Sequence, residues 1–368
     1  MKNILLLLLF CVLISCKNEK SSNTYSYNLK ASEIIKSFVL DSDVKYNAFY
    51  LYTFSDDKGK EYLTFLNYRT NQILFYDLET TDFLFKLNLN SEGPHGVVQP
   101  TGLYVKDLNH IYVSSYAYSG LMRVDTTCHI IQKIPYGITS KGYNVLPSYT
   151  PSSHPYIAPV IIDKKIYITQ NAIDRFHPIV DTPLSVVIDT VQKSCEDLPL
   201  TYGILTEKEL AIKDPRFSRV FNGKEFIYSF YVSEDIVVTS VDHSEVKKIS
   251  VKSKYLDSPI VKQEVSERGP QLNLELARYG DLIYDPYREV YYRFVYPKTT
   301  LEDNIRWWGK SVYGRKKFSV IILNKDFQII GETLFPESIY NSYVFFVHKD
   351  GLYISRDYQM IYRQSEDY

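Results

Sequence analysis

The residue types that could carry metal or catalytic chemistry are few and scattered along this chain. Three histidines, His95, His154 and His177, fall in predicted loops that could share one face, and imidazole is a common metal ligand. The chain contains no HxH or HxxxH spacing, and proline adjoins these histidines, which is typical of plain turns. The sequence therefore predicts no metal site and no cofactor.

Motifs of nucleophilic or phosphate chemistry are also missing. No GxSxG elbow occurs, and the stretch "EGPHG" lacks the strand, glycine loop and helix that hold a phosphate. A Ser-His-Asp arrangement assembled from distant segments stays open, and the 43 acidic residues single out no carboxylate pair for glycoside cleavage. We therefore assign no catalytic residue from the sequence.

Arginine and aromatic side chains in long loops give a different signal, since this mixture is typical of surfaces that bind a protein, peptide or glycan. The adjacent Trp307 and Trp308 are the most informative, because exposed neighbouring tryptophans are uncommon without a partner. The alternatives are a tryptophan that plugs its own loop and arginines that are merely solvated or ion-paired. The candidate contacts are Arg69, Tyr116, Arg175, His177, Arg219, Arg268, Arg278, Trp307, Trp308, Arg356 and Tyr358.

A repeated strand pattern shows which elements must position these loops. A polar turn followed by an apolar stretch with tyrosine at the same place occurs six times, and a period of this size indicates a repeat architecture. The interval runs from 50 residues, Tyr62 to Tyr112, to 63 residues, Tyr228 to Tyr291. The repeated tyrosines are Tyr62, Tyr112, Tyr167, Tyr228, Tyr291 and Tyr353. We expect each to lie on a middle strand and to pack between neighbouring units.

The pattern around each tyrosine predicts four antiparallel strands. One short apolar strand mostly precedes the tyrosine strand, and two follow it, joined by a tight turn at Asp or Asn, which tolerate left-handed backbone. These turn residues are Asp77, Asp125, Asp189, Asp242 and Asn324. Units of this size with four short strands match a propeller blade, so we predict an all-β, six-bladed β-propeller.

The two ends of the chain are complementary in this interpretation. The last unit stops short of a fourth strand, and residues 31–41 supply a strand that would complete it and close the ring. Residues 31–368 are then a single domain, which we expect to be monomeric. A large sandwich or two separate β domains is the alternative.

The N-terminus has the features of an export signal. Lys2 precedes an apolar run of signal length that is too short to span a membrane comfortably, so residues 1–15 are interpreted as a signal peptide. The polar residues after Cys16 are typical of a flexible tether, which we assign to residues 16–30. Only Cys128 and Cys195 remain in the mature chain; they could form one disulfide, but the sequence does not place them side by side.

Composition excludes one class of partner. The formal net charge is −1 and no basic stripe is present, so nucleic acid is not an expected partner. The 34 tyrosines suit half-buried strands with wet outer faces.

Two resemblances extend this interpretation. Leu13-Ile14-Ser15-Cys16 resembles the lipobox of bacterial lipoproteins, in which cleavage precedes a cysteine that then carries acyl chains. Two further motifs are Gly93-Pro94 and the turn Asp285-Pro286-Tyr287, which leads into Tyr291, Tyr292 and Arg293. With these motifs, nearly the whole mature chain resembles uncharacterised TolB-like six-bladed propeller lipoproteins of Bacteroides and relatives. The resemblance implies the fold and a lipid anchor in the cell envelope, with the outer membrane expected and its side left open. It implies no activity.

Two functions from different classes remain. The favoured hypothesis is a non-catalytic envelope lipoprotein whose propeller face binds a protein, peptide or glycan. The alternative is a propeller enzyme, a lyase or hydrolase, acting on a glycan or lactone. Buried, hydrogen-bonded histidine and carboxylate groups at the channel mouth would favour the enzyme, and a shallow aromatic and basic rim would favour binding.

Overall fold

The structure is a computed structural model that describes ten segments of the chain. These are residues 26–40, 51–67, 70–115, 117–142, 157–170, 178–212, 216–256, 277–298, 317–337 and 339–356.

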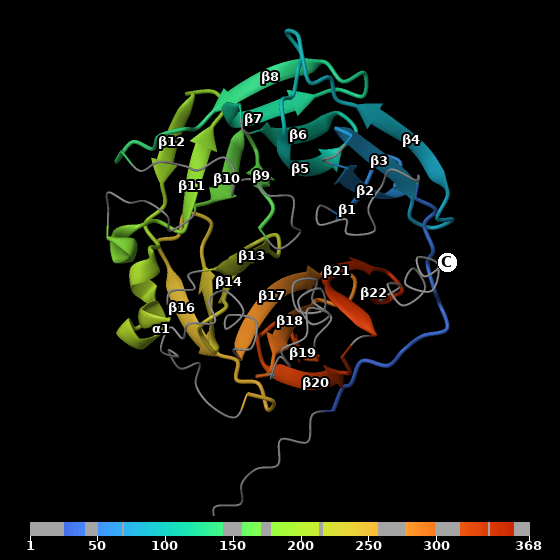
Figure 1. Cartoon of the computed structure of the whole chain (residues 1–368). Helices are drawn as coiled ribbons and strands as arrows, with labels where there is room; N and C mark the ends of the chain where they lie inside the picture. Colours follow the sequence, from blue (N-terminus) through green and yellow to red (C-terminus); the bar gives the residue numbers. More distant parts are fainter. Residues whose placement is uncertain are drawn as a thin grey trace, which may run out of the picture.

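Five four-stranded antiparallel sheets follow one another along the chain and are arranged around a common centre, as the blades of a β-propeller (Figure 1). In each, the strands lie in sequence order, with the first strand of the blade nearest the centre. Blade 1 consists of β1 (Leu51–Ser55), β2 (Glu61–Asn67), β3 (Gln72–Asp77) and β4 (Phe83–Asn88). Blade 2 consists of β5 (Pro100–Asp107), β6 (His110–Ser115), β7 (Tyr118–Val124) and β8 (Ile130–Pro135).

The next three blades repeat this order. Blade 3 consists of β9 (Val160–Ile162), β10 (Lys165–Thr169), β11 (Ser185–Asp189) and β12 (Ser194–Asp197). Blade 4 consists of β13 (Phe217–Phe221), β14 (Phe226–Phe230), β15 (Asp235–Thr239) and β16 (Val246–Ser250). Blade 5 consists of β17 (Arg278–Asp285), β18 (Val290–Tyr296), β19 (Phe318–Leu323) and β20 (Ile329–Phe335). The all-β prediction and the four-stranded blade are confirmed.

Three short helical segments occur in this part of the chain. The 3₁₀ turn η1 (Ile179–Asp181) lies within blade 3, between β10 and β11, whereas the 3₁₀ turn η2 (Tyr202–Ile204) and the helix α1 (Glu207–Ala211) connect blade 3 to blade 4. Thr206 and Glu209 form a capping box at the start of α1, which satisfies two backbone donors that the first turn leaves free. Within the described residues, no helix is both long and apolar enough to cross a membrane.

The prediction of six four-stranded blades differs from what the structure describes, which is five blades and a two-stranded sheet. This hairpin consists of β21 (Tyr340–His348) and β22 (Gly351–Arg356), and β21 contacts both β17 and β1, so it lies between blades 5 and 1.

The predicted N-terminal strand is not seen either, because residues 26–40 form no ladder and their one bridge joins Tyr27 to Gly331 of β20. Side chains hold the segment instead: Phe38 and Leu40 pack on blade 1, and Lys36 donates a hydrogen bond to the Leu78 carbonyl.

The repeated tyrosines lie on the second strand of every sheet, as predicted. The Tyr228 hydroxyl is 2.7 Å from Ser185 Oγ of the preceding blade, and the Tyr291 hydroxyl accepts a hydrogen bond from Asn222 of blade 4. Tyr228 and Tyr291 therefore join neighbouring blades. The turn residues are also confirmed: Asp77, Asp125, Asp189, Asp242 and Asn324 each accept backbone N–H groups of their own turn.

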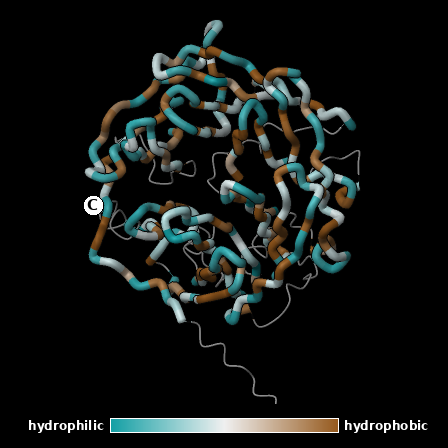
Figure 2. The backbone as a smooth tube through the Cα atoms, turned by 180° about the vertical axis from the view of Figure 1, so that it is seen from behind, coloured by the Kyte–Doolittle hydropathy of each residue, from teal (hydrophilic) through white to brown (hydrophobic). Residues whose placement is uncertain are grey.

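The apolar core is divided into layers, one between each pair of adjacent sheets. Four layers lie between consecutive blades, a fifth joins blade 5 to the hairpin, and a sixth joins the hairpin and the N-terminal segment to blade 1. Hydrophobic positions are accordingly interspersed with hydrophilic ones along the strands (Figure 2). Cys128 and Cys195 pack in two different layers and are both free thiols.

Candidate functional site

A cavity of about 420 Å³ opens where the innermost strands end at their first turns. Its walls come from β1, β5, β17 and β21, because the first strand of each sheet faces the centre of the propeller. We call it the central pocket. Six aromatic side chains line it: Tyr52, Phe54, Tyr104, Tyr284, Tyr287 and Phe346.

The phenols of the pocket are neutral. Burial raises the pKa of Tyr52 and of Tyr104 well above the ordinary value, and burial also raises that of Tyr284. These hydroxyls therefore remain protonated at physiological pH and can donate hydrogen bonds. The charged side chains among the described lining residues are Glu61 and the exposed Lys106.

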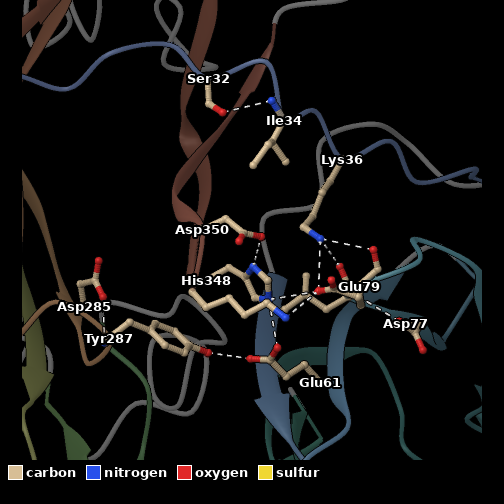
Figure 3. A network of polar contacts seen from close by, with 12 residues as sticks. Ser32, Ile34, Lys36, Glu61, Asp77, Glu79, Asp285, Tyr287, His348 and Asp350 are labelled. Carbon is tan, nitrogen blue, oxygen red and sulfur yellow. Dashed lines mark hydrogen bonds and ion pairs between the residues drawn. The ribbon is translucent and has the colours of Figure 1, made fainter.

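Glu61, the first residue of β2, is the pocket's carboxylate. Its Oε1 accepts a hydrogen bond of 2.6 Å from the Tyr287 hydroxyl, and its Oε2 lies 2.9 Å from His348 Nε2 (Figure 3). Burial pushes the pKa of Glu61 upward, but the hydrogen bonds from Tyr287 and His348 outweigh it and hold that pKa below the ordinary value. Glu61 is therefore an ionised carboxylate at neutral pH.

His348, the last residue of β21, lies behind Glu61 and is 0% exposed. Its Nδ1 lies 2.9 Å from Asp350 Oδ2, so each ring nitrogen faces a carboxylate oxygen. The imidazolium form can donate to both, whereas the neutral ring can donate to only one.

Glu79, from the β3–β4 turn, completes what we call the carboxylate–histidine cluster: Glu61, Glu79, His348 and Asp350. Glu79 Oε2 lies 3.8 Å from His348 Nε2, 3.1 Å from Lys349 Nζ and 3.9 Å from Lys36 Nζ. One ligand atom from each of Glu61, Glu79 and His348 lies within 4.8 Å of the others, and no other group of this kind occurs among the described residues. These three residues could hold a metal ion.

Most of the candidate contacts predicted from the sequence lie outside the described residues. They are Arg69, Tyr116, Arg175, His177, Arg268, Trp307, Trp308 and Tyr358, and their assignment stays a prediction. Of the histidines weighed as ligands, His95 packs against His129, and His154 lies outside the described residues as well.

The three described candidates are separated. Arg356 is exposed at the end of β22. Arg278 is 4% exposed, with its guanidinium against the rings of Tyr231 and Tyr296. Arg219 is 1% exposed and donates hydrogen bonds to Ser185 Oγ and to the carbonyls of Ala158 and Tyr167, which ties blade 4 to blade 3.

The central pocket and the cluster lie at first-to-second and third-to-fourth strand turns. The sequence favoured the crossovers and the second-to-third strand connections instead, and most of those loops lie outside the described residues.

Sequence reasoning missed Glu61 and His348 because 287 positions separate them. One signal was available: both residues flank the polar turn that precedes a repeated tyrosine, and Tyr287 lies in the quoted Asp285-Pro286-Tyr287 turn.

Comparisons with known proteins identify a family for this chain and solved structures that it resembles. The model of a family described as "Domain of unknown function (DUF4221)" matches residues 26–334. A crystal structure of a member of this family from Bacteroides vulgatus is 26% identical and superposes with a TM-score of 0.72, over 86% of this chain and 90% of that chain. A putative exported protein from Bacteroides fragilis is 10% identical, with a TM-score of 0.49 over 81% of this chain and 74% of that one. No curated protein matches the chain.

Proposed function

The chain belongs to the DUF4221 family of unknown function, and we propose that it is a non-catalytic cell-envelope lipoprotein whose propeller binds a segment of a glycan in the central pocket. The observation that carries the proposal is the aromatic wall of this pocket together with a single ionised carboxylate, Glu61.

The pocket combines apolar area with a few oriented polar groups, which is the usual composition of a small-molecule site. Tyrosine rings can cover the C–H faces of a sugar, while their hydroxyls donate to its oxygens. The Glu61 carboxylate, held by Tyr287 and His348, has lone pairs left to accept from sugar hydroxyls. A volume of about 420 Å³ suits a short segment of a polymer and not a folded domain.

The lipid anchor is the second part of the proposal. The apolar run before Cys16 and the lipobox resemblance support cleavage and acylation at this cysteine, and two or more acyl chains give stable anchoring. Metabolic labelling with an alkyne fatty acid should label the protein in membranes, and Cys16→Ser should abolish both the label and the membrane fraction. Equal labelling of the two proteins would refute the anchor.

The architecture we propose is a six-bladed, TolB-like propeller in which β21 and β22 form the inner half of the sixth blade. Six apolar layers support this count, since each layer in a propeller separates two blades. A cavity of about 760 Å³ lies between β22 and the segment 27–38, where further strands of such a blade would fit. The N-terminal segment then closes the ring by side-chain packing on blade 1.

A second function, a propeller lyase or hydrolase acting on a glycan or lactone, is favoured by one observation. His348 lies hydrogen-bonded between Glu61 and Asp350 directly behind the pocket. Against it, the lowered pKa of Glu61 makes this carboxylate a weak base, whereas a general base works best with a pKa near the operating pH.

The test is a glycan array on the purified chain, followed by calorimetric titration of the best glycan and a product assay. Tyr287→Phe should weaken binding about tenfold, because Glu61 loses its hydroxyl donor and can turn away from the pocket. Tyr27→Phe, also an exposed tyrosine, is the matched control and should bind as the wild type does.

Three outcomes decide between the functions. Binding that Tyr287→Phe weakens and that yields no product supports the proposal. Product formation moves the assignment to the enzyme. Binding that is lost only in Trp307→Ala/Trp308→Ala, or that is specific for a peptide, refutes the central pocket as the glycan site.

A further inference from the structure

The geometry of the carboxylate–histidine cluster points to a site for a divalent transition-metal ion. We propose that Glu61, Glu79 and His348 bind Zn²⁺ or a similar first-row ion at the seam between blade 1 and the β21–β22 hairpin. This site stands independently of glycan binding, although Glu61 belongs to both.

The spacing of the ligand atoms fits such an ion. His348 Nε2 lies 2.9 Å from Glu61 Oε2 and 3.8 Å from Glu79 Oε2. Ligands about 2.0–2.1 Å from a tetrahedral zinc ion lie roughly 3.3 Å from each other. These two separations bracket this value, and all three ligand atoms lie within 4.8 Å of one another, so modest shifts of the two carboxylates would form the site.

The ligand types narrow the choice of ion. One imidazole nitrogen with two carboxylate oxygens suits zinc, iron or manganese, whereas calcium and magnesium prefer oxygen alone. Three protein ligands leave a further position for water, as in catalytic zinc sites. That position would open on the side of Glu79, whose side chain is 59% exposed.

Residues behind the ligands hold them in orientation. Asp350 faces His348 Nδ1 at 2.9 Å, which directs Nε2 toward Glu61 and Glu79. The hydroxyl of Tyr287 holds the other oxygen of Glu61. A carboxylate on the second nitrogen of a ligating histidine is a recurrent feature of metal sites, since it fixes the tautomer and strengthens the ligand.

In the structure, ammonium groups of the protein lie beside Glu79, the exposed ligand. Lys349 Nζ lies 3.1 Å and Lys36 Nζ 3.9 Å from Glu79 Oε2. A metal ion therefore competes with the Lys349 ammonium for this carboxylate. This competition gives a test that separates a metal site from an ordinary ion-pair network.

The experiment is calorimetric titration of the purified, chelator-treated full chain with Zn²⁺ at pH 7, repeated with Co²⁺ followed by visible absorption. We expect one saturable site. Glu79→Gln, at a largely exposed side chain that folding does not require, should weaken the affinity at least tenfold. Lys349→Met, which removes the competing ammonium, should strengthen it severalfold. Glu245→Gln, an exposed glutamate in the β15–β16 turn, is the matched control and should change nothing.

Opposite results would overturn the site. The absence of saturable binding, or a Zn²⁺ affinity that Glu79→Gln leaves unchanged, shows that these residues do not bind the ion. Weaker binding in Lys349→Met would also refute the competition. His348→Asn tests the imidazole directly, and the Co²⁺ spectrum of the wild type reports nitrogen ligation if that variant does not fold.

Discussion

His243 and Asp281 are two buried groups whose effects on stability should oppose each other between pH 4.5 and 7. Both are 1% exposed, and burial favours the neutral form of each, which lowers the pKa of His243 and raises the pKa of Asp281. One is a base and the other an acid, so acidification should destabilise the fold through the first and stabilise it through the second. The contributions of these two groups to the free energy of unfolding should therefore nearly cancel over this pH range. Two substitutions separate the contribution of His243 from that of Asp281.

The contribution of His243 is a loss of stability at low pH. Burial, and then the nearby Arg219 charge, lowers its pKa from 6.5 to about 4 in the folded chain. The Tyr228 hydroxyl lies 2.5 Å from Nε2 and the Val241 carbonyl 3.1 Å from Nδ1, which suits a neutral ring. Between pH 6.5 and 4 the unfolded chain binds a proton that the folded chain does not, which costs about 3 kcal/mol over this window.

Asp281 acts with the opposite sign. Burial raises its pKa from 3.8 to about 6, against the hydrogen bond from the Tyr231 hydroxyl and the charges of Arg278 and Arg216. Its Oδ2 has no hydrogen-bond partner among the described residues. The folded chain keeps a proton that the unfolded chain loses, so stability falls by about 3 kcal/mol as the pH rises from 3.8 to 6.

The assay is urea unfolding of the wild type, Asp281→Asn and His243→Gln at four pH values from 4.5 to 7. We compare the free energy of unfolding of each variant with that of the wild type, because all other titrating groups then cancel. The Asp281→Asn difference should become more favourable by about 2 kcal/mol on going from pH 4.5 to 7. The His243→Gln difference should become less favourable by about 2.5 kcal/mol. Differences constant with pH, or slopes of equal sign, would refute the assignment of these two pKa shifts.

Three further predictions concern single residues. Arg293→Met should lower the free energy of unfolding, measured in urea, by about 3–5 kcal/mol. The reason is that the fully buried guanidinium donates to Ser229 Oγ and to the carbonyls of Phe230, Ser233, Glu234, Asp235 and Val251, and a loss under 1 kcal/mol would contradict this. Gly331→Ala should make residues 26–40 more susceptible to limited proteolysis while changing the stability of the blades little. The reason is that an added Cβ would lie 2.3 Å from the Tyr27 carbonyl oxygen. Unchanged cleavage would count against this prediction. Burial raises the pKa of Cys195 to about 12. Its alkylation at pH 8, followed by mass spectrometry, should therefore be roughly a thousandfold slower than that of a free thiol of pKa 9.0. A rate near that of a free thiol would contradict the burial of this side chain.

The parts of the fold that the sequence predicted are those set by local chemistry. The repeated tyrosine identified the second strand of every sheet, because the period of a blade repeats along the chain. The turn residues Asp77 and Asp242 were identified for a similar reason, since a side chain that bonds its own turn needs no distant partner.

What the sequence did not predict depends on contacts between distant segments. His348 and Glu61 meet only because blade 1 adjoins the hairpin, and no pattern in either segment records this. The N-terminal segment was expected to supply the strand that the last unit lacks. Its apolar side chains also suit packing on a neighbouring blade, and Phe38 and Leu40 pack on blade 1 in that way.

The bridge between Tyr27 and Gly331 determines where the propeller first experiences a mechanical load. Residue 27 pairs in parallel with β20, so any force applied through the chain before residue 26 reaches the outer edge of blade 5 first. The segment that follows is held by a few side-chain contacts and by one lysine on the Leu78 carbonyl, and no ladder adds to them. Tension should therefore peel residues 26–40 from the surface before it strains a blade. The segment would act as a short mechanical buffer between whatever holds the N-terminus and the central pocket.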